Sequence, residues 1–338
     1  MAVLVTGGAG YIGSHVVRLL QDRGEDVVVV DDMSSGIRER AGNATVLELD
    51  LAGGDDVDVT AKLAACMLRN EVTSVVHFAA KKQVGESVDR PLWYYQNNVT
   101  GLRHVIGAMQ DAGVQEIVFS SSAATYGMPD ADIIPETYPC QPINPYGQTK
   151  LVGEWMIDNA VRRGSMRAIK LRYFNVAGAG WDDLRDPAVM NLVPIVYDRL
   201  KSGEKPVVFG DDYDTPDGTC IRDYVHVKDL ADAHLVALDH LAAGHGRAGE
   251  GKDLGAGDHG SPVFNVGTGN GSSVKEVIDA ISRVIGHEVE YVIGDRRAGD
   301  PPRLVADVGA IAEHLGWTAT HDLDDMARTA CPPELLPR

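Results

Sequence analysis

The sequence predicts an α/β protein built on a doubly wound parallel sheet. In the first half of the chain, short runs of β-branched residues alternate with longer amphipathic segments. The short runs are apolar throughout, which is typical of strands that helices cover on both faces. Strands are expected at residues 2–6, 27–30, 45–49, 74–78, 116–120 and 167–172, and helices at residues 13–23, 60–69, 92–112 and 146–163.

The pattern changes after Phe174. Loops lengthen, although residues 224–241 still resemble a strand–helix unit of the first half and are expected to return to the main sheet. Residues 244–260 contain seven glycines and predict an exposed, flexible loop. A strand is expected at residues 263–266, and Ser273 with Glu276 forms a capping box that opens a helix running through Arg283.

The composition restricts the class of partner. The 338 residues include 31 Lys and Arg against 49 Asp and Glu, a formal net charge of −18. This charge disfavours nucleic acid or an anionic membrane surface as the main partner. Apolar runs are too short for a membrane span, and no signal peptide is recognisable. Four irregularly spaced cysteines predict neither disulfides nor a zinc site, so a cytoplasmic location is expected.

A glycine-rich segment follows the first expected strand. Residues 8–13 fit the pattern GxGxxG, as do residues 244–249 and 255–260. Only the first match lies between a strand and a helix. There Gly7, Gly10 and Gly13 would let a pyrophosphate approach bare backbone at the positive end of the helix dipole.

An acidic pair ends the next strand. Asp31 follows Gly13 by 18 residues, where a carboxylate binds the ribose hydroxyls of a dinucleotide. Asp31 and Asp32 together would repel a 2′-phosphate. The sequence therefore favours NAD over NADP as the cofactor.

Two segments fit the pattern YxxxK, and they differ in expected secondary structure. Tyr146 and Lys150 lie on an expected helix, where residues four apart are neighbours with Cβ atoms about 6 Å apart. Tyr224 and Lys228 begin on an expected strand, where four residues span about 13 Å. Tyr146 and Lys150 are therefore the candidate catalytic pair, and Tyr224 is expected to pack or to line a ligand site.

The chemistry of a phenol explains the pairing. Free tyrosine has a pKa of about 10, so it acts as a base near neutral pH only when cationic neighbours favour the phenolate. Lys150 would supply one such charge. Ser122 follows an expected strand at the ligand-binding edge of the sheet, where its hydroxyl could connect Tyr146 to a substrate hydroxyl.

These motifs resemble those of the extended short-chain dehydrogenase/reductases, which have a Rossmann-like fold, and within them the UDP-glucose (UDP-galactose) 4-epimerases. The resemblance covers nearly the whole chain. The segments that carry it are residues 6–13, 77–80, 84–87, 94–99, 120–122, 146–150, 171–175, 217–227 and 296–300.

The resemblance implies an NAD-dependent enzyme that inverts C4 of a UDP-hexose through a transient 4-keto sugar. Tyr146 would be the base, Lys150 would tune it, and Ser122 would assist proton transfer. Implied contacts to NAD are Gly7, Gly10, Tyr11, Ile12, Gly13, Asp31, Ser35, Gly36, Asp50, Leu51, Phe78, Ala79, Ala80, Lys82, Asn97, Ser120, Tyr146, Lys150 and Phe174. Implied contacts to the UDP-sugar are Ser122, Tyr146, Asn175, Asn191, Leu192, Val207, Phe209, Arg222, Arg297 and Asp300.

The resemblance also implies a division of the chain and a homodimer. Residues 1–174, with residues 220–243, would form the NAD-binding domain. Residues 175–219 and 244–338 would bind the nucleotide sugar. Family members often pair through helices such as those expected at residues 92–112 and 146–163.

His234, His240 and His245 lack a nearby carboxylate cluster, so no metal is expected.

Two departures and several alternatives qualify this assignment. Leu304 stands where some members carry a tyrosine beside the sugar, which predicts room for 2-N-acetyl sugars. The glycine-rich loop at residues 244–260 is longer than expected for the family.

Other nucleotide-sugar enzymes of the family, a pentose 4-epimerase, a dehydratase or a decarboxylase, remain alternatives. Ala123 and Ala124 follow Ser122 where dehydratases carry an Asp-Glu pair, which disfavours elimination. An NAD-sensing regulator would not need Tyr146, Lys150 and Ser122 together.

Overall fold

Seven parallel strands form the main sheet of the computed structural model, which describes residues 2–53, 58–164, 166–256, 260–297 and 299–337. The sheet has the order β10-β6-β5-β4-β1-β2-β3, and every neighbouring pair runs parallel. This confirms the predicted doubly wound class. The strands are β1 (Ala2–Thr6), β2 (Asp26–Asp31), β3 (Thr45–Glu48), β4 (Val72–His77), β5 (Glu116–Ser122), β6 (Arg167–Tyr173) and β10 (Val263–Val266).

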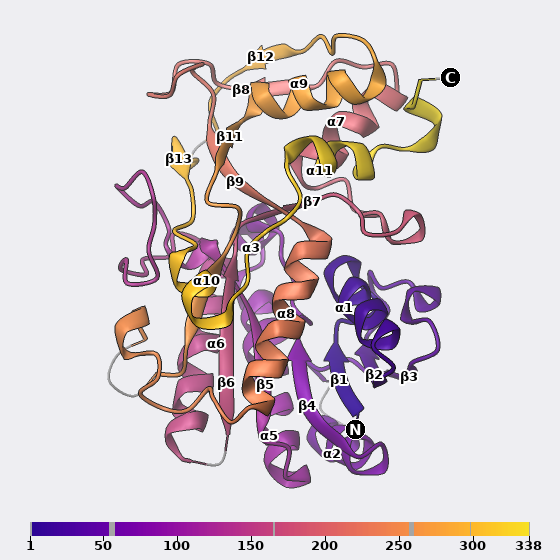
Figure 1. Ribbon diagram of the computed structural model, residues 1–338, viewed down its shortest axis with the longest axis vertical. Coiled ribbons are helices and arrows are strands. Elements are labelled where there is room, and N and C mark those ends of the chain that lie inside the picture. Colours follow the sequence, from indigo (N-terminus) through magenta and orange to yellow (C-terminus); the bar gives the residue numbers. More distant parts are fainter. Residues whose placement is uncertain (1, 54–57, 165, 257–259, 298, 338) are drawn as a thin grey trace.

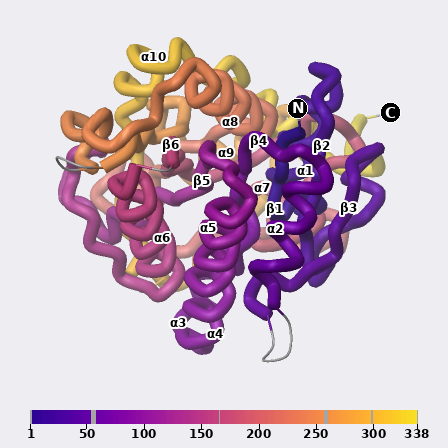
Figure 2. The backbone as a smooth tube through the Cα atoms, turned by 90° about the horizontal axis from the view of Figure 1, so that it is seen from below, coloured from indigo at the N-terminus to yellow at the C-terminus, as the bar shows by residue number. Residues whose placement is uncertain are grey.

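Helices cover both faces of this sheet. On one face, α1 (Tyr11–Asp22), α8 (Val227–Ala242) and α10 (Gly309–Leu315) contribute to one apolar core. On the other, α2 (Val59–Arg69), α5 (Gly101–Ala112) and α6 (Pro145–Arg162) contribute to a second. Figure 2 shows α6, α5 and α2 side by side in one layer. The apolar runs of β1, β2, β4, β5, β6 and β10 are buried, as their sequences predicted, whereas β3 at the edge of the sheet is only half-buried or exposed.

A second group of elements lies beyond the carboxyl ends of the main strands, at the top of Figure 1. Its central strand is β9 (Ile221–His226), which pairs with β7 (Asn175–Ala177), β11 (Gly271–Ser273) and β13 (Arg303–Leu304). A separate pair joins β8 (Val207–Phe209) to β12 (Val292–Gly294). Three helices complete the group: α7 (Leu192–Lys201), α9 (Val274–Ile285) and α11 (Leu323–Ala330).

The strand–helix unit expected to return to the main sheet does so only in part. The helix α8 packs on that sheet, but the strand before it, β9, belongs to the second group. The strand β10, placed by sequence with the substrate-binding residues 244–338, instead forms the edge of the main sheet beside β6. Apolar periodicity identifies a strand, but it does not identify the strand's neighbours.

The helix expected at residues 92–112 is interrupted by a π-helical turn. It consists of α4 (Pro91–Tyr95), a π-helical turn over Gln96–Thr100, and α5. It follows α3 (Val84–Asp89). π-helical turns often occur at functional sites, and this one carries Asn97.

The glycine-rich loop is more packed than predicted. Leu254, in a 3₁₀ turn over Lys252–Leu254, is buried in the core beside α8. The carbonyl of Gly246 accepts a hydrogen bond of 2.8 Å from the backbone N–H of Ala168 in β6. The competing glycine pattern at residues 255–260 includes 257–259, which lie outside the described residues. The other 3₁₀ turns are Arg38–Ala41, Ala123–Thr125, Asp182–Leu184 and Pro333–Leu335.

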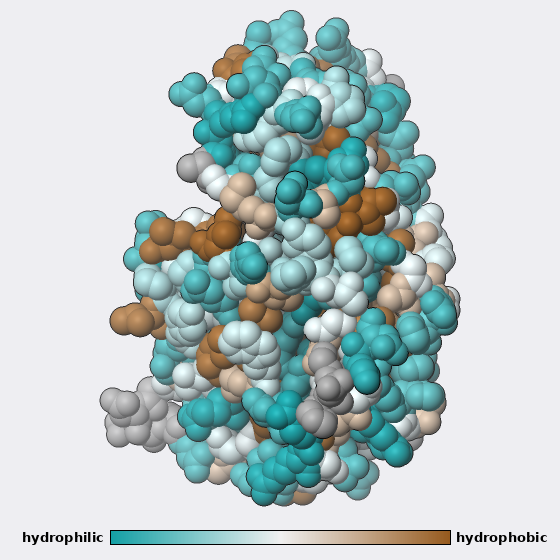
Figure 3. Space-filling model, turned by 90° about the vertical axis from the view of Figure 1, so that its left-hand side faces the viewer, coloured by the Kyte–Doolittle hydropathy of each residue, from teal (hydrophilic) through white to brown (hydrophobic). Residues whose placement is uncertain are grey.

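On the face shown in Figure 3, hydrophilic residues dominate and hydrophobic ones form small separate clusters. None of the helices in the described part of the chain is both long and apolar enough to cross a membrane.

A single buried carboxylate connects the second group of elements to its loops. Asp223 in β9 is fully buried and accepts hydrogen bonds from the backbone N–H groups of Thr268, Gly269 and Ala306, at 2.8, 3.0 and 3.1 Å. The Thr268 hydroxyl donates a fourth at 2.9 Å. Burial raises the pKa of Asp223, and these donors lower it.

Replacing Asp223 with Ala is expected to lower the free energy of unfolding by about 3 kcal/mol or more, because three buried backbone N–H groups lose their acceptor. Denaturant titration measures the change. Asp324→Ala is the control, since that carboxylate lies on the surface in an ion pair with Arg283 and contributes less than about 1 kcal/mol. Equal losses in the two variants would contradict this role for Asp223.

Candidate active site

The loop between β1 and α1 is shaped by close backbone contacts. Gly7 adopts a left-handed conformation with φ of +69°, and its carbonyl accepts the N–H of Gly10 at 3.1 Å. A Cβ on Gly13 would lie 2.2 Å from the carbonyl oxygen of Gly7. Because only glycine fits there, the first turn of α1 lies directly against the loop and leaves its N-terminus open to an anion.

Asp31 holds this loop from the end of β2. Its carboxylate accepts hydrogen bonds from the backbone N–H groups of Ala9, at 3.1 Å, and Met33, at 3.0 Å. Burial raises the pKa of Asp31, and the two donors lower it. An ionised carboxylate has about four acceptor positions, so two stay available for ribose hydroxyls.

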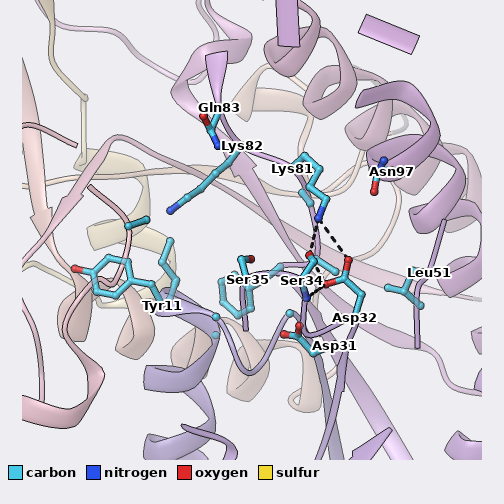
Figure 4. Close-up of a pocket in the computed structure, with 18 of the residues that line it drawn as sticks. Tyr11, Asp31, Asp32, Ser34, Ser35, Leu51, Lys81, Lys82, Gln83 and Asn97 are labelled. Carbon is cyan, nitrogen blue, oxygen red and sulfur yellow. Dashed lines mark hydrogen bonds and ion pairs between the residues drawn. The ribbon is translucent and has the colours of Figure 1, made fainter. Parts of the chain in front are cut away.

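A cavity of about 560 Å³ opens beside the loop, along the carboxyl ends of β1, β2 and β4 (Figure 4). All but three of the residues predicted to contact NAD line it. Those lining residues are Gly7, Gly10, Tyr11, Ile12, Gly13, Asp31, Ser35, Asp50, Leu51, Phe78, Ala79, Ala80, Lys82, Asn97, Tyr146 and Lys150. The glycine backbone, the Asp31 carboxylate and the Lys82 ammonium suit the pyrophosphate and ribose groups of a dinucleotide.

Three of the predicted residues do not line the cavity. A Cβ on Gly36 would meet the Asp31 carboxylate at 2.7 Å, so this glycine lets the loop close on that side chain. The Ser120 hydroxyl donates to the Tyr173 hydroxyl at 2.9 Å. Phe174 is buried in a separate small core that includes Tyr126.

The candidate catalytic residues come from α6 and β5. Asn144 caps α6 by accepting the N–H of Gly147 at 2.9 Å, and Pro145 opens the helix, so Tyr146 and Lys150 lie one turn apart as predicted. The Lys150 ammonium donates to the Ser120 carbonyl at 2.7 Å. Ser122, at the end of β5, accepts the N–H of Ala124 at 3.2 Å. Tyr224, by contrast, lies in β9, and Lys228 lies in α8.

Burial sets the pKa values of the pair in the protein without cofactor. Burial raises the pKa of Tyr146, and a hydrogen bond from Ser122 lowers it. Burial lowers the pKa of Lys150 to about 8, against the charge of Glu154, which raises it. In the protein without cofactor, burial thus outweighs any lowering of the phenol's pKa by Lys150. Desolvation dominates, and the ammonium already donates to a backbone carbonyl.

Sequence reasoning missed a group of residues at the mouth of the cavity. Lys81 donates to Ser34 at 2.8 Å and lies 3.4 Å from the Asp32 carboxylate (Figure 4). The Lys81 ammonium and the Arg90 guanidinium also lie over the Trp93 ring, 5.5 and 3.9 Å from its centroid. These residues come from the loops after β2 and β4 and from the start of α4, and they share no motif. The other unpredicted lining residues are Val30, Leu49, Ala52, Gln83, Glu86, Tyr173, Asp186, Pro187, Ala188 and Met190.

Of the residues predicted to contact the sugar nucleotide, Tyr146 alone lines this cavity. The others lie mainly in the second group of elements. The structure brings Arg222 to 3.5 Å from Asp300, and it stacks the Arg297 guanidinium 3.9 Å from the centroid of Phe209.

The remaining predicted sugar-nucleotide contacts lie on neighbouring elements. Asn191, which donates to Asp186 at 3.4 Å, immediately precedes α7 with Leu192 as its first residue. Asn175 pairs with Tyr224 between β7 and β9, and Val207 begins β8. Within the described residues, no cluster of three or more His, Cys, Asp or Glu is arranged to hold a metal ion.

Comparisons of the sequence and of the structure with known proteins indicate the same family. The sequence pattern of the NAD dependent epimerase/dehydratase family matches residues 3–251. The UDP-glucose 4-epimerase of Azospirillum brasilense is 45% identical over 334 residues, which cover 97% of this chain and 90% of the relative.

Solved structures agree with this comparison. The UDP-glucose 4-epimerase from Brucella ovis, in complex with NAD, superimposes with a TM-score of 0.89 at 40% identity and covers 99% of both chains. The enzyme from Stenotrophomonas maltophila, with bound NAD and formylated UDP-arabinopyranose, gives 0.88 at 39% identity and covers 98% of this chain and 96% of its own.

Replacing Lys150 with Met is expected to stabilise the protein. The pKa of Lys150 is about 8 in the folded chain, below its ordinary value of 10.5. Burying the charged form therefore costs about 3 kcal/mol at neutral pH. The folded state holds fewer protons than the unfolded state between these two values, so the wild-type protein gains stability as pH rises through them.

Denaturant titrations of the two proteins at about pH 7 and about pH 10 measure this effect. The Lys150→Met variant should be the more stable at neutral pH, and its advantage should shrink at the higher pH. Lys62→Met, at an exposed position on α2, is the control and should show no such change. A Lys150→Met variant no more stable than wild type at neutral pH would show that the ammonium is well compensated.

Proposed function

Because this chain belongs to the NAD-dependent epimerase/dehydratase family, we propose that it works through Tyr146, Lys150 and Ser122. The chain is an NAD-dependent epimerase that inverts C4 of a UDP-hexose, interconverting UDP-glucose and UDP-galactose. The observation that carries this function is the position of Tyr146 and Lys150. Both line the same cavity as the glycine loop and Asp31, in a chain closely similar to NAD-bound UDP-glucose 4-epimerases.

Residues of this chain move a proton at the 4-hydroxyl of the sugar. With NAD bound, the positive charges of Lys150 and of the oxidised nicotinamide ring would favour the phenolate of Tyr146, and it is this phenolate that accepts the proton. Ser122, hydrogen-bonded to the phenol, connects it to the sugar oxygen. When bound, NAD supplies the acceptor, and later the donor, of the hydride at C4. Tyr146 returns the proton once the 4-keto sugar has presented its opposite face. No net oxidation results.

Lys150 stabilises the charge that Tyr146 carries during this reaction. Its ammonium is fixed by the Ser120 carbonyl, so it can stabilise negative charge on Tyr146 without leaving its position. The side chain is also close enough to the cavity to hold a ribose hydroxyl of the cofactor.

We assign the sugar nucleotide to the second group of elements. Arg222 and Arg297 supply the guanidinium groups that a pyrophosphate dianion needs in a protein with a net charge of −18. Asn175, Asn191, Leu192, Val207, Phe209 and Asp300 lie on neighbouring elements of that group. Residues 175–219 and 244–338 are thus proposed as the substrate-binding part, apart from β10, which completes the main sheet.

Elimination and decarboxylation are not favoured. Ala123 and Ala124 directly follow Ser122, and a methyl side chain cannot exchange a proton with the sugar. A dehydratase would need acidic groups there.

We further propose a homodimer that forms through α3, α4 and α6. Val84, Val88 and Leu92 are 49, 60 and 82% exposed, and Trp155 on α6 is 56% exposed. Together they offer apolar area that a second copy could cover. We also propose a cytoplasmic location, with which four free cysteines are consistent. UDP-galactose as a substrate would place the enzyme in galactose metabolism.

Tyr146→Phe is expected to lower kcat for the conversion of UDP-galactose to UDP-glucose by about 10²- to 10⁴-fold, because the general base is lost. Tyr95→Phe is the matched control. The Tyr95 hydroxyl donates a hydrogen bond to Gln148, which lies on α6 together with Tyr146, but Tyr95 does not line the cavity. The activity of this variant should therefore be retained. Full activity of the Tyr146→Phe enzyme would rule out the proposed role of Tyr146.

Leu304 offers a test of sugar specificity. It lies on β13 opposite Arg222 and packs against the small core that contains Ala123, next to Ser122. Leu304→Tyr should remove activity on UDP-N-acetylglucosamine and preserve activity on UDP-glucose, since the larger ring narrows the site. Leu304→Met, which conserves volume, should keep both. A wild-type enzyme without any activity on the N-acetyl sugar would refute this specificity.

A further inference from the structure

Two ion pairs, one fully buried and one partly buried, join α6 to β6 beneath the active site. Arg172 binds both oxygens of Glu154, with Nη2–Oε2 at 2.6 Å and Nε–Oε1 at 2.8 Å. One helical turn farther from the site, Lys170 binds Asp158 at 2.6 Å. The side chains of Arg172 and Glu154 are only 3 and 4% exposed. Replacing both members of a buried ion pair with apolar residues often leaves the free energy of unfolding unchanged, so stability alone does not explain these pairs.

Glu154 is held in a fixed position. The Ser121 hydroxyl donates to its Oε1 at 2.5 Å, in addition to the two bonds from Arg172. Arg172 is itself held by the Tyr126 hydroxyl at 3.1 Å and the Glu136 carbonyl at 3.3 Å. Every polar partner of the carboxylate is therefore anchored in the core.

The position of Glu154 relates it to the catalytic helix. It follows Lys150 by four residues on α6, so the two side chains share one face of the helix. Ser120 and Ser121, which bind Lys150 and Glu154 respectively, are neighbours on β5. The ammonium and the carboxylate are thus aligned along the same helix–strand contact.

We propose that Glu154 is a positioning residue that keeps Lys150 protonated during the reaction, with Arg172 and Ser121 fixing its carboxylate. Glu154 touches neither the cavity nor the reacting atoms, and it acts through Lys150. This inference rests on the proposed function of Tyr146 and Lys150.

The other groups around Lys150 cannot replace this carboxylate. The Phe119 ring, 5.3 Å away, and the Ser120 carbonyl stabilise an ammonium only weakly. His77 is neutral, because burial and then the charge of Lys150 lower its pKa to about 3. Tyr146 is protonated in the resting protein, because burial raises the pKa of its phenol.

Glu154 itself faces two positive charges on β6. Arg172 and Lys170, both on β6, lower its pKa against the effect of burial. Its charge in turn raises the pKa of the Cys140 thiol, whose own shift is mainly due to burial. Glu154 therefore stays ionised over the whole range in which Lys150 titrates, and its charge raises the pKa of Lys150.

The test compares Glu154→Gln with Asp158→Asn in the enzyme loaded with NAD. Both variants neutralise the acidic partner of a buried α6–β6 ion pair, so both should lose stability. Only Glu154→Gln should move the alkaline limb of the pH profile of kcat, toward lower pH by about one unit. Coincident alkaline limbs for Glu154→Gln and wild type would overturn the proposal.

A second variant and a second readout cover the case in which the Glu154→Gln protein does not fold. In Glu154→Gln/Arg172→Gln no unpaired guanidinium is left in the core, yet Lys150 still loses its acidic neighbour. A downward shift is therefore still expected, and it should be smaller because a positive charge is removed together with the negative one. Titration of the Lys150 side chain by NMR in the protein without NAD, with Lys150→Met to identify its signal, should show the same lowering. An unchanged Lys150 titration in this double variant would overturn the inference.

The two hypotheses fail in different ways. A wild-type enzyme that does not interconvert UDP-glucose and UDP-galactose would refute the proposed function. An active wild-type enzyme whose Glu154 variants keep the wild-type pH profile and Lys150 titration would refute the role of Glu154 alone.

Discussion

The hydrogen bond from the Lys150 ammonium to the Ser120 carbonyl fixes the catalytic helix on the main sheet. It joins α6, which carries Tyr146, to β5, which carries Ser122, over 2.7 Å inside the protein. A buried ammonium is costly, and the low pKa of Lys150 reflects that cost. The geometry of the site thus depends on a charge that the fold tolerates only because a carbonyl, an aromatic ring and the Glu154 carboxylate surround it.

One continuous segment links this helix–strand contact to the rest of the molecule. Arg172 binds Glu154 in the core, and Tyr173, the next residue, lines the cavity. Phe174 packs in the small core that includes Ala123, and Asn175 begins the first strand of the second group. Four consecutive residues therefore contribute in turn to the buried ion pair, the cofactor cavity, the small core near Ser122 and the substrate-binding part. This continuity fixes the cofactor cavity and the substrate-binding part relative to each other.

The features that depend on local sequence pattern were predicted correctly. The β1–α1 loop, Asp31 at the end of β2, and Tyr146 with Lys150 on one helix all follow from spacing and periodicity, and the structure has each of them. Pattern did not predict contacts between distant loops, such as Lys81 with Asp32 and Ser34. It also placed β9 in the wrong sheet, because strand neighbours are chosen by the whole fold. The raised pKa of Tyr146 in the protein without cofactor could not be predicted, because a sequence shows which charges are near but not how far water is excluded.

In this account the side chains of the protein move only a proton, and the hydrogen bound to C4 returns to the sugar that it left. The most direct measurement mixes UDP-galactose deuterated at C4 with UDP-galactose labelled throughout its sugar with carbon-13, and follows the product by mass spectrometry. The account predicts UDP-glucose that keeps its deuterium at C4, on molecules without carbon-13. Deuterium lost to water, or found on the carbon-13 sugar, would contradict it.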